Sequence, residues 1–478
     1  MSIGLKIVRK IYPIILSGGS GKRLWPLSTK DLPKQFHALY SDKPIIIETA
    51  LRVQGHQFAK PTVICNEGQR FHVASCFHDY NIELDDIILE PVSKSTAAAI
   101  ATATHHIRKK DPEGIILILP SDHYFKDTSS FVDHIGKAAQ SANSNHIITF
   151  GITPTKPETG YGYIRIGDRI DDNLYAIDQY VEKPDRETAN EYLASSQYYW
   201  NGGIFMGSVN AFEGAFQNHA PDIWATVGEA YGQAQKDLDF LRLDKDHMKG
   251  SPDESFDYAI MEKIGGHGAM HPLDVEWNDL GSWDALWDIA NKNDDGNVVL
   301  GDISENNNKN CYLRNSNDRS LAVLGLEDIV VVSSQNAVFV AHKDYLQDIE
   351  IICENMIQKN CPSIYSAIKR QPWGQIKTLQ SNGHFAAKEV TIYPNKSTAV
   401  QVHQLRSEHW VVIEGVATIT RGDDVFDLHA GQSTAIPQNT HHQIQNNGDV
   451  PLVIFEVQSG EIDEADVIRP DHLKKKTI

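Results

Sequence analysis

The sequence is short of positive charge. Its 478 residues include 44 Lys and Arg against 63 Asp and Glu, which gives a formal net charge of −19. A chain this acidic has no overall attraction to nucleic acid or to an anionic membrane, so neither is expected as a partner. A phosphorylated ligand would therefore need a local basic site, with a divalent cation beside it.

Cysteine is scarce too, with five residues and no Cys-x-x-Cys pair. The small, odd number argues against a disulfide framework or a thiolate zinc site, and it suits a reducing cytoplasm. No apolar run approaches the roughly 20 residues that span a bilayer. Pro13 and the glycines after Ser17 interrupt the first apolar stretch, so no secretory signal is expected.

The composition is that of an ordinary folded protein, with 41% hydrophobic and 22% charged residues, and the length predicts two or three domains. In the first half, short apolar runs alternate with longer mixed segments. Strands are predicted at residues 13–16, 62–65, 87–89, 115–119 and 146–150, and helices at 95–109 and 129–142. This alternation indicates an α/β domain with a mostly parallel sheet, whose ligand site lies beyond the carboxyl ends of the strands.

The composition changes after residue 290. A predicted helix at residues 283–290 closes the first domain, and residues 291–296 and 305–310 are Asn-rich turn material. Short strands, among them residues 329–332 and 338–340, predict a β-rich linker region over 291–365. Regularly spaced short strands from residue 386 onward predict a small β-barrel over 366–478. No internal repeat is visible.

A glycine-rich loop, residues 17–23, follows the first predicted strand. Its glycines let backbone N–H groups approach a polyphosphate, and Lys22 and Arg23 add countercharge. A Walker loop would need Ser or Thr where Arg23 stands, and a dinucleotide fingerprint would need glycine where Leu24 stands. Taken alone, the loop leaves open a simple turn that binds nothing.

Residues 16–36 as a whole resemble the signature of mannose-1-phosphate guanylyltransferases, in which the loop precedes a Pro-Lys-Gln-Phe element, here residues 33–36. The resemblance implies a Rossmann-like, GT-A-like nucleotidyltransferase domain over residues 1–290. It also implies that Arg23 and Lys34 contact a triphosphate. Attack on the α-phosphorus builds charge on oxygen, so positioning and neutralisation supply the catalysis.

Further motifs occur in the order of that family. Asp122, in Leu-Pro-Ser-Asp-His, and Asp279, in Trp-Asn-Asp-Leu-Gly-Ser-Trp, are implied Mg²⁺ ligands. Lys183 is implied to hold the sugar phosphate, which completes a catalytic set of Arg23, Lys34, Asp122, Lys183 and Asp279. The implied nucleotide-binding residues are Leu16, Ser17, Gly18, Gly19, Gly21, Lys22, Glu90, Pro91, Ser95 and Thr96. The implied sugar-binding residues are Gly160, Tyr161, Gly162, Glu182 and Asn201.

One departure concerns the nucleotide side of this pattern. Lys94 and Ser95 stand where the family has Arg and Asn. A serine reaches less far than an asparagine and lacks its paired donor and acceptor. The resemblance therefore supports the type of reaction more strongly than it supports a preference for guanine.

The barrel resembles the cupin domain of type II phosphomannose isomerases. His403, Glu408 and His442 match metal-ligand positions, but Leu405 replaces a second histidine and Gln371 replaces an arginine. Two interpretations stay open: a weakened three-ligand site for Zn²⁺, Mn²⁺ or Co²⁺, or relics in a barrel kept for folding or oligomer contacts.

The resemblance implies an enzyme that converts GTP and mannose 1-phosphate to GDP-mannose and diphosphate with Mg²⁺, for polysaccharide or glycan assembly. It also implies a cytoplasmic homo-oligomer, with a dimer favoured. One alternative is a bifunctional enzyme that also isomerises mannose 6-phosphate. Another is a non-catalytic regulatory protein that binds nucleotide sugar, against which the presence of Arg23, Lys34, Asp122 and Asp279 argues.

Overall fold

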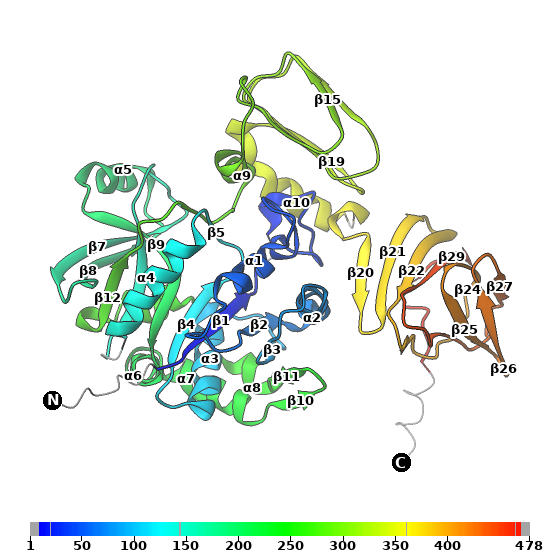
Figure 1. The fold of residues 1–478 in the computed structure, drawn as a ribbon, viewed down its shortest axis with the longest axis horizontal. Coiled ribbons are helices and arrows are strands. Elements are labelled where there is room, and N and C mark those ends of the chain that lie inside the picture. The colour runs from blue at the N-terminus through cyan, green and yellow to red at the C-terminus, as the bar shows by residue number, and fades with distance from the viewer. Residues whose placement is uncertain (1–8, 20, 143–144, 360, 464, 470–478) are drawn as a thin grey trace. The chain divides into compact units, whose positions relative to one another are not determined.

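The computed structural model describes residues 9–19, 21–142, 145–359, 361–463 and 465–469 (Figure 1). Ser20 of the glycine-rich loop lies outside the described residues. The chain divides into two compact units, residues 1–364 and 365–478. No helix in the described ranges is long and apolar enough to cross a membrane.

An 11-stranded sheet forms the centre of the first unit, in the order β10-β11-β3-β2-β1-β4-β9-β6-β12-β8-β7. Its strands are β1 Ile11–Ser17, β2 Thr62–Asn66, β3 Ile87–Glu90, β4 Ile115–Pro120, β6 Ile147–Ile152, β7 Gly162–Arg169, β8 Tyr175–Glu182, β9 Tyr198–Ser208, β10 Gln235–Asp237, β11 Phe240–Arg242 and β12 Gly268–Pro272. The strands from β11 to β4 are parallel, whereas β9 runs antiparallel to β4 and β6. The predicted α/β class is confirmed, and its parallel half carries the glycine-rich loop.

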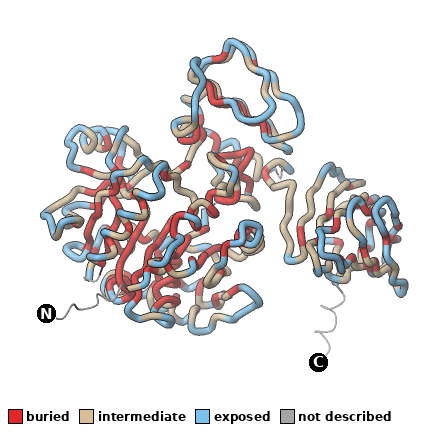
Figure 2. The backbone as a smooth tube through the Cα atoms, in the orientation of Figure 1, coloured by how far each residue is buried: buried red, intermediate tan, exposed pale blue. Residues whose placement is uncertain are grey.

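Helices cover both faces of this sheet. They are α1 Ile45–Arg52, α2 Arg70–Asp79, α3 Thr96–Lys110, α4 Thr128–Ser141, α5 Arg186–Ser195, α6 Val209–His219, α7 Pro221–Gly232 and α8 Lys245–Gly250. A further helix, α9 Trp283–Ile289, lies beside the strands that follow it, where Trp283 packs on Tyr312 (Figure 1). Side chains of a strand alternate between the faces. Thus Ile116 and Ile118 of β4 pack with α3, α6 and α7, while Leu117 and Leu119 pack with α4. Because both faces are covered, the central strands are buried along their length (Figure 2).

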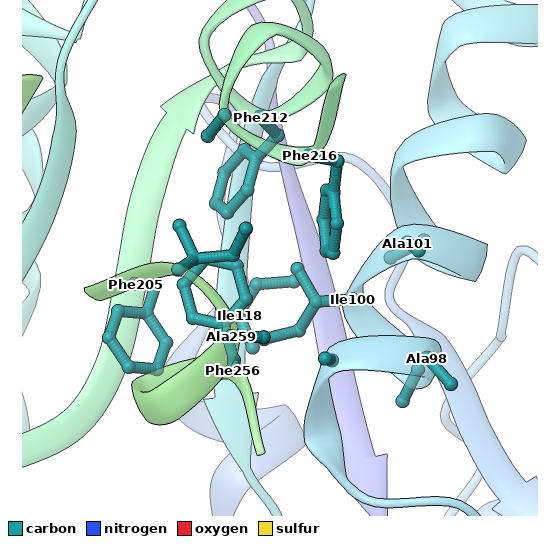
Figure 3. Packing of buried hydrophobic residues seen from close by; sticks show 14 of the residues in the cluster. Ala98, Ile100, Ala101, Ile118, Phe205, Phe212, Phe216, Phe256 and Ala259 are labelled. Carbon is teal, nitrogen blue, oxygen red and sulfur yellow. The ribbon is translucent and has the colours of Figure 1, made fainter. Parts of the chain in front are cut away.

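Small residues let α3 lie close to the sheet. Figure 3 shows Ala98 and Ala101 of α3 beside a group of aromatic rings that includes Phe212 and Phe216. Phe205 and Phe256 pack edge to face, with ring centroids 4.8 Å apart. This core fixes the strands whose carboxyl ends carry the candidate site.

Parallel strands stack as rungs after α9. β14 Val298–Leu300, β16 Tyr312–Asn315 and β18 Ile329–Ser333 pair in sequence, and β15 Ile303–Asn306 pairs with β17 Leu321–Leu324. β19 Val338–His342 closes the larger sheet, and α10 Ile349–Gln358 follows. The predicted short strands are confirmed, and they stack as rungs although no repeat is visible in the sequence. The prediction of a turn over residues 305–310 was wrong for its first two residues, because residues 305 and 306 belong to strand β15.

The second unit is the predicted β-barrel. One sheet has the order β20-β21-β22-β29-β24-β27 and the other β23-β28-β25-β26. The strands are β20 Ile368–Gln371, β21 Gly374–Ser381, β22 Phe385–Ile392, β23 Lys396–Ser397, β24 Arg406–Glu414, β25 Val416–Arg421, β26 Asp424–His429, β27 Ser433–Ile436, β28 His442–Asn446 and β29 Leu452–Gly460. Inward-facing side chains of both sheets, among them Trp410, form its core.

Candidate active site

The glycine-rich loop and the Asp122 loop leave the sheet at neighbouring positions. β1 and β4 are parallel partners with Leu16 opposite Pro120, and the Ser121 amide donates to the Leu16 carbonyl at 3.1 Å. Ser17 is buried, while Gly18, Gly19, Lys22 and Arg23 are exposed. The sequence therefore brings exposed cations and an aspartate to one edge, as α/β folds do at ligand sites.

The Pro-Lys-Gln-Phe element packs under this loop. Phe36 is buried among residues of β1, β2 and α1. The Gln35 amide donates to the Ser17 hydroxyl at 3.1 Å, which ties the element to the end of β1. With its neighbour fixed on the core side, Lys34 is directed to the charged edge.

Lys34 approaches the loop closely at Gly21. The φ of Gly21 is +60°, and a Cβ there would lie 2.9 Å from the Lys34 Cβ and 3.0 Å from the Ser28 hydroxyl oxygen. Both the left-handed backbone and the lack of space require glycine at this position.

Lys34 joins the two predicted metal ligands. Its Nζ lies 3.1 Å from Asp122 Oδ2 and donates to the Asp279 main-chain carbonyl at 2.8 Å. A short antiparallel pair, β5 Tyr124–Phe125 with β13 Trp277–Asn278, places the loops of the two aspartates side by side. The structure thus assembles Lys34, Asp122 and Asp279, three residues far apart in sequence.

His123, next to Asp122 in the chain, is held neutral. The Trp277 indole donates to its Nδ1 at 3.2 Å. Burial lowers the pKa of His123 to about 4, against the opposing influence of Asp122 and Asp279. A neutral imidazole adds no positive charge to compete with a metal ion here.

A cavity of about 540 Å³ opens beside these residues. Its lining includes Arg23, Gly160, Tyr161, Trp277 and Asp279. Burial, reinforced by Asp279, raises the pKa of the Tyr161 phenol, so this group stays protonated and can donate a hydrogen bond. Two predicted catalytic residues, Arg23 and Asp279, and two predicted sugar residues, Gly160 and Tyr161, therefore line one pocket.

The remaining predicted sugar residues form a second cluster behind this loop. The Lys183 amide donates to the Tyr161 carbonyl at 3.2 Å, and Lys183 Nζ lies 3.1 Å from Glu182 Oε1. Glu182 Oε2 is buried without a hydrogen-bond partner among the described residues, and a Cβ at Gly162 would approach it to 2.5 Å. One carboxylate oxygen at this cluster thus remains for a ligand hydroxyl.

Asp257 is a buried member of this cluster that the sequence did not reveal. Asn201 Nδ2 donates to Asp257 Oδ1 at 2.9 Å, and the Tyr180 hydroxyl donates to the same oxygen. Burial raises the pKa of Asp257, although Tyr180 and Asn201 oppose this. Asp257 lies in none of the motifs recognised in the sequence, and only the fold brings residues 201 and 257 together.

The predicted nucleotide-binding residues at the end of β3 and beyond it differ in whether their polar atoms have hydrogen-bond partners. Glu90 is buried, and burial raises the pKa of its carboxyl to about 8. Glu90 Oε1 has no hydrogen-bond partner among the described residues. Beyond Pro91, Ser95 donates to Asp253 at 2.7 Å, and Thr96 accepts from the Phe256 amide, so both hydroxyls hold the segment before Asp257.

The barrel brings together His403, Glu408 and His442, all buried, with candidate ligand atoms within 4.8 Å of one another. Each histidine Nδ1 faces a carbonyl oxygen, of Asp466 at 2.5 Å and Thr440 at 2.9 Å. A carbonyl only accepts, so Nδ1 carries hydrogen, and Nε2 of the neutral ring presents a lone pair. These Nε2 atoms lie 3.2 and 3.6 Å from Glu408, an arrangement that fits a cation between them.

Arg406 partly fills the same centre. Its guanidinium donates to His403 Nε2 at 3.2 Å and to Glu408 Oε1 at 3.3 Å. Burial alone would raise the pKa of Glu408, but His403 and His442, when protonated, and Arg406 lower it to about 2. Leu405, by contrast, is 41% exposed and supplies no ligand atom.

Comparisons with known proteins agree with this arrangement. Residues 12–296 match the family model described as nucleotidyl transferase, residues 307–356 a mannose-phosphate isomerase/GMP-like beta-helix domain, and residues 359–472 the mannose-6-phosphate isomerase C-terminal domain. The first of these matches spans more than half of the chain, which therefore belongs to the nucleotidyltransferase class.

Full-length relatives narrow this class. A mannose-1-phosphate guanylyltransferase of Klebsiella pneumoniae is 38% identical over 96% of this chain and 98% of its own length. The alginate biosynthesis protein AlgA of Pseudomonas aeruginosa is 37% identical over 98% of both. The chain belongs to the mannose-1-phosphate guanylyltransferase family, with its fused isomerase-type domain. A solved structure described as mannose-1-phosphate geranyltransferase from Thermus thermophilus is 28% identical and covers 73% of this chain and 99% of its own, with a TM-score of 0.64.

Proposed function

We propose that the protein transfers the guanylyl group of GTP to mannose 1-phosphate, forming GDP-mannose and releasing diphosphate. The observation that carries this proposal is the junction of Lys34 with Asp122 and Asp279 at the open edge of the parallel strands. Cations for phosphate and carboxylates for a metal ion occur there together, as nucleotidyl transfer requires.

In this proposal the amides of Gly18, Gly19 and Gly21, with Lys22 and Arg23, bind the triphosphate. The two aspartates fit Mg²⁺, because this ion prefers carboxylate oxygens and both lie on loops joined by one lysine. Mg²⁺, when bound, neutralises phosphate charge. Lys34 neutralises the α-phosphate as the sugar phosphate attacks in line, so no covalent intermediate on the protein is needed.

Mannose 1-phosphate is assigned to the 540 Å³ cavity and the cluster behind its loop. Lys183 is the proposed partner of the sugar phosphate. Glu182, with its unpaired Oε2, and Asn201, fixed by Asp257, are the proposed partners of sugar hydroxyls. Tyr161 supplies a protonated phenol at the cavity wall.

Glu90 is our candidate for base recognition. Guanine offers adjacent N–H donors, and the buried carboxyl of Glu90 has an oxygen free to accept. Because Ser95 is engaged by Asp253, we assign it the support of this region rather than a direct base contact.

A second candidate activity, isomerisation of mannose 6-phosphate and fructose 6-phosphate, is favoured by one observation in the barrel. His403 and His442 direct Nε2 lone pairs toward Glu408, which suits Zn²⁺, Mn²⁺ or Co²⁺ with three protein ligands. Such an ion would polarise sugar oxygens while a proton moves between carbons. Arg406 competes for this centre, so we expect weak metal binding and weak activity.

We place the reaction in the cytoplasm, for polysaccharide assembly, and in a homodimer. The five cysteines, which all lie in the described ranges, form no disulfide there, as a reducing compartment favours. The edge strand β19 exposes Val338 and Val340 by 61% and 60%, an apolar pair that a second subunit would cover.

The test is diphosphate release by the purified protein with mannose 1-phosphate and each of the four NTPs. We expect release that depends on a divalent metal and is fastest with GTP. No release with any NTP would contradict nucleotidyl transfer, and equal rates with all four would contradict guanine recognition.

A further inference from the structure

Helix α10, which follows the β-helix rungs, packs directly on the phosphate loop. Cys353 Sγ lies 3.7 Å from the Lys22 carbonyl oxygen. The Trp25 indole donates to the Ser363 carbonyl at 3.1 Å, and the Lys30 amide donates to that of Ile364 at 3.0 Å. The segment after the rungs is therefore a wall of the nucleotide site, although it belongs to no loop of the sheet.

This wall places a carboxylate on the arginine proposed to bind triphosphate. Arg23 Nε donates to Glu350 Oε1 at 2.8 Å, across 327 residues of sequence. Both side chains are about half exposed, 57% for Arg23 and 49% for Glu350, so this ion pair is weak and easily broken.

The pair lies where two cavities meet. Arg23 and Glu350 line the 540 Å³ cavity and also a 390 Å³ cavity at the phosphate loop, and Asp279 and Gly281 line both as well. Glu354, one turn further along α10, lines only the smaller cavity. Glu350 thus faces the boundary that a sugar phosphate would cross to reach a nucleotide.

We infer that Glu350 is the counter-ion that a nucleoside triphosphate must displace from Arg23, so that α10 sets the affinity of the site for nucleotide. This inference rests on the proposed nucleotidyl transfer. Phosphate oxygens compete with the Glu350 carboxylate for the same planar guanidinium. A triphosphate carries more negative charge than one carboxylate, so it displaces Glu350 from Arg23. When diphosphate leaves, the pair re-forms. Glu350 is therefore a positioning residue that acts through Arg23.

The experiment measures GTP affinity by calorimetry and the KM and kcat of diphosphate release for Glu350→Gln. The amide keeps the size of the side chain but removes its charge. We expect Kd and KM for GTP to fall about fivefold, with kcat within about twofold of the parent. Glu350→Asp should keep most of the parent's KM. The matched variant Glu354→Gln, on the same helix, should change KM for GTP by less than about twofold.

Two further measurements distinguish a direct ion pair between Arg23 and Glu350 from general repulsion between the Glu350 carboxylate and the triphosphate. The difference between parent and Glu350→Gln should shrink as salt rises from about 50 to about 300 mM, because exposed charges are screened. In an Arg23→Ala background, Glu350→Gln should have no further effect on GTP affinity.

The inference is overturned if Glu350→Gln leaves GTP affinity unchanged or weakens it. It is also overturned if Glu354→Gln has an equal effect, or if the Glu350→Gln effect persists without Arg23. These results differ from failure of the proposed function, in which the parent protein itself would release no diphosphate.

Discussion

Lys34 and Asp122 form an ion pair of 3.1 Å at the carboxyl edge of the parallel strands, and Lys34 is only 13% exposed. Because the same ammonium donates to the main chain of Asp279, one side chain joins the loops of both aspartates. The cluster carries both signs of charge before any ligand arrives. A site organised in this way needs little rearrangement to accept an anion and a cation together.

Gly21→Ala should damage the fold of the phosphate loop. The new methyl group would lie 2.9 Å from the Lys34 Cβ, on a backbone with φ of +60°. We expect a loss of about 1–3 kcal/mol in the free energy of unfolding and a lower kcat, because Lys34 must shift. Gly18→Ala is the matched control for stability, since nothing lies within 4 Å of its added Cβ. Equal unfolding free energies of the two variants would contradict the proposed packing.

Lys183→Ala should raise KM for mannose 1-phosphate far more than KM for GTP. The proposal places its ammonium on the sugar's phosphate, so only one substrate loses a charged partner. Lys60→Ala, which removes a surface pair with Glu83, serves as the control. Steady-state kinetics with each substrate varied in turn give the answer, and equal changes in both KM values would count against this role.

The stability of the protein should depend on pH through Glu90. Burial raises the pKa of its carboxyl from the ordinary value of 4.5 to about 8. The folded chain therefore holds a proton that the unfolded chain releases above about pH 4.5. Stability from this group is full below that pH and is lost as pH rises toward about 8.

Burial also raises the pKa of Glu456, to about 7, so this group adds its own pH dependence. Comparing the parent with Glu90→Gln separates the contribution of Glu90, because Glu456 is the same in both proteins. The parent should lose up to about 3–4 kcal/mol relative to the variant between pH 5 and pH 8. Denaturant unfolding at several pH values measures the difference. A constant difference across that range would show that the Glu90 carboxyl is not protonated in the folded protein.

Leu405→His should increase the amount of divalent metal that the barrel retains after dialysis. It would add an imidazole near a centre where His403, Glu408 and His442 already converge. Elemental analysis provides the measurement, with Leu405→Gln as a control of similar size. Turnover need not follow, since Gln371 would still replace the family's arginine. Unchanged metal content in Leu405→His, or efficient isomerisation by the parent with added Mn²⁺, Co²⁺ or Zn²⁺, would contradict the view that Leu405 weakens the site.

Much of the fold was predictable because its strands are short apolar runs between helices. Residues 115–119 were predicted as a strand and β4 is Ile115–Pro120, while residues 95–109 were predicted as a helix and α3 is Thr96–Lys110. The β-helix rungs were harder. Each is only three to five residues long and their spacing is irregular, so no periodic pattern marks the repeat.

The candidate site was predictable only where its residues lie in contiguous motifs. The pairing of Arg23 with Glu350 and of Asn201 with Asp257 depends on tertiary structure, across 327 and 56 residues. The engagement of Ser95 by Asp253 likewise has no local signal. Partners of this kind are carboxylates in ordinary polar segments, and the sequence alone does not distinguish them from solvated charges.

The Mg²⁺ dependence of diphosphate release in Asp279→Asn tests the central claim most directly. This change leaves the main-chain oxygen that holds Lys34, and an amide oxygen can still accept from the Gly281 amide, so the loop should keep its form. We expect kcat to fall about a hundredfold and half-maximal activity to need more Mg²⁺, with Asp294→Asn, in an exposed turn, like the parent. An Asp279→Asn protein with the parent's rate and Mg²⁺ dependence would contradict the assignment of this edge as the site of nucleotidyl transfer.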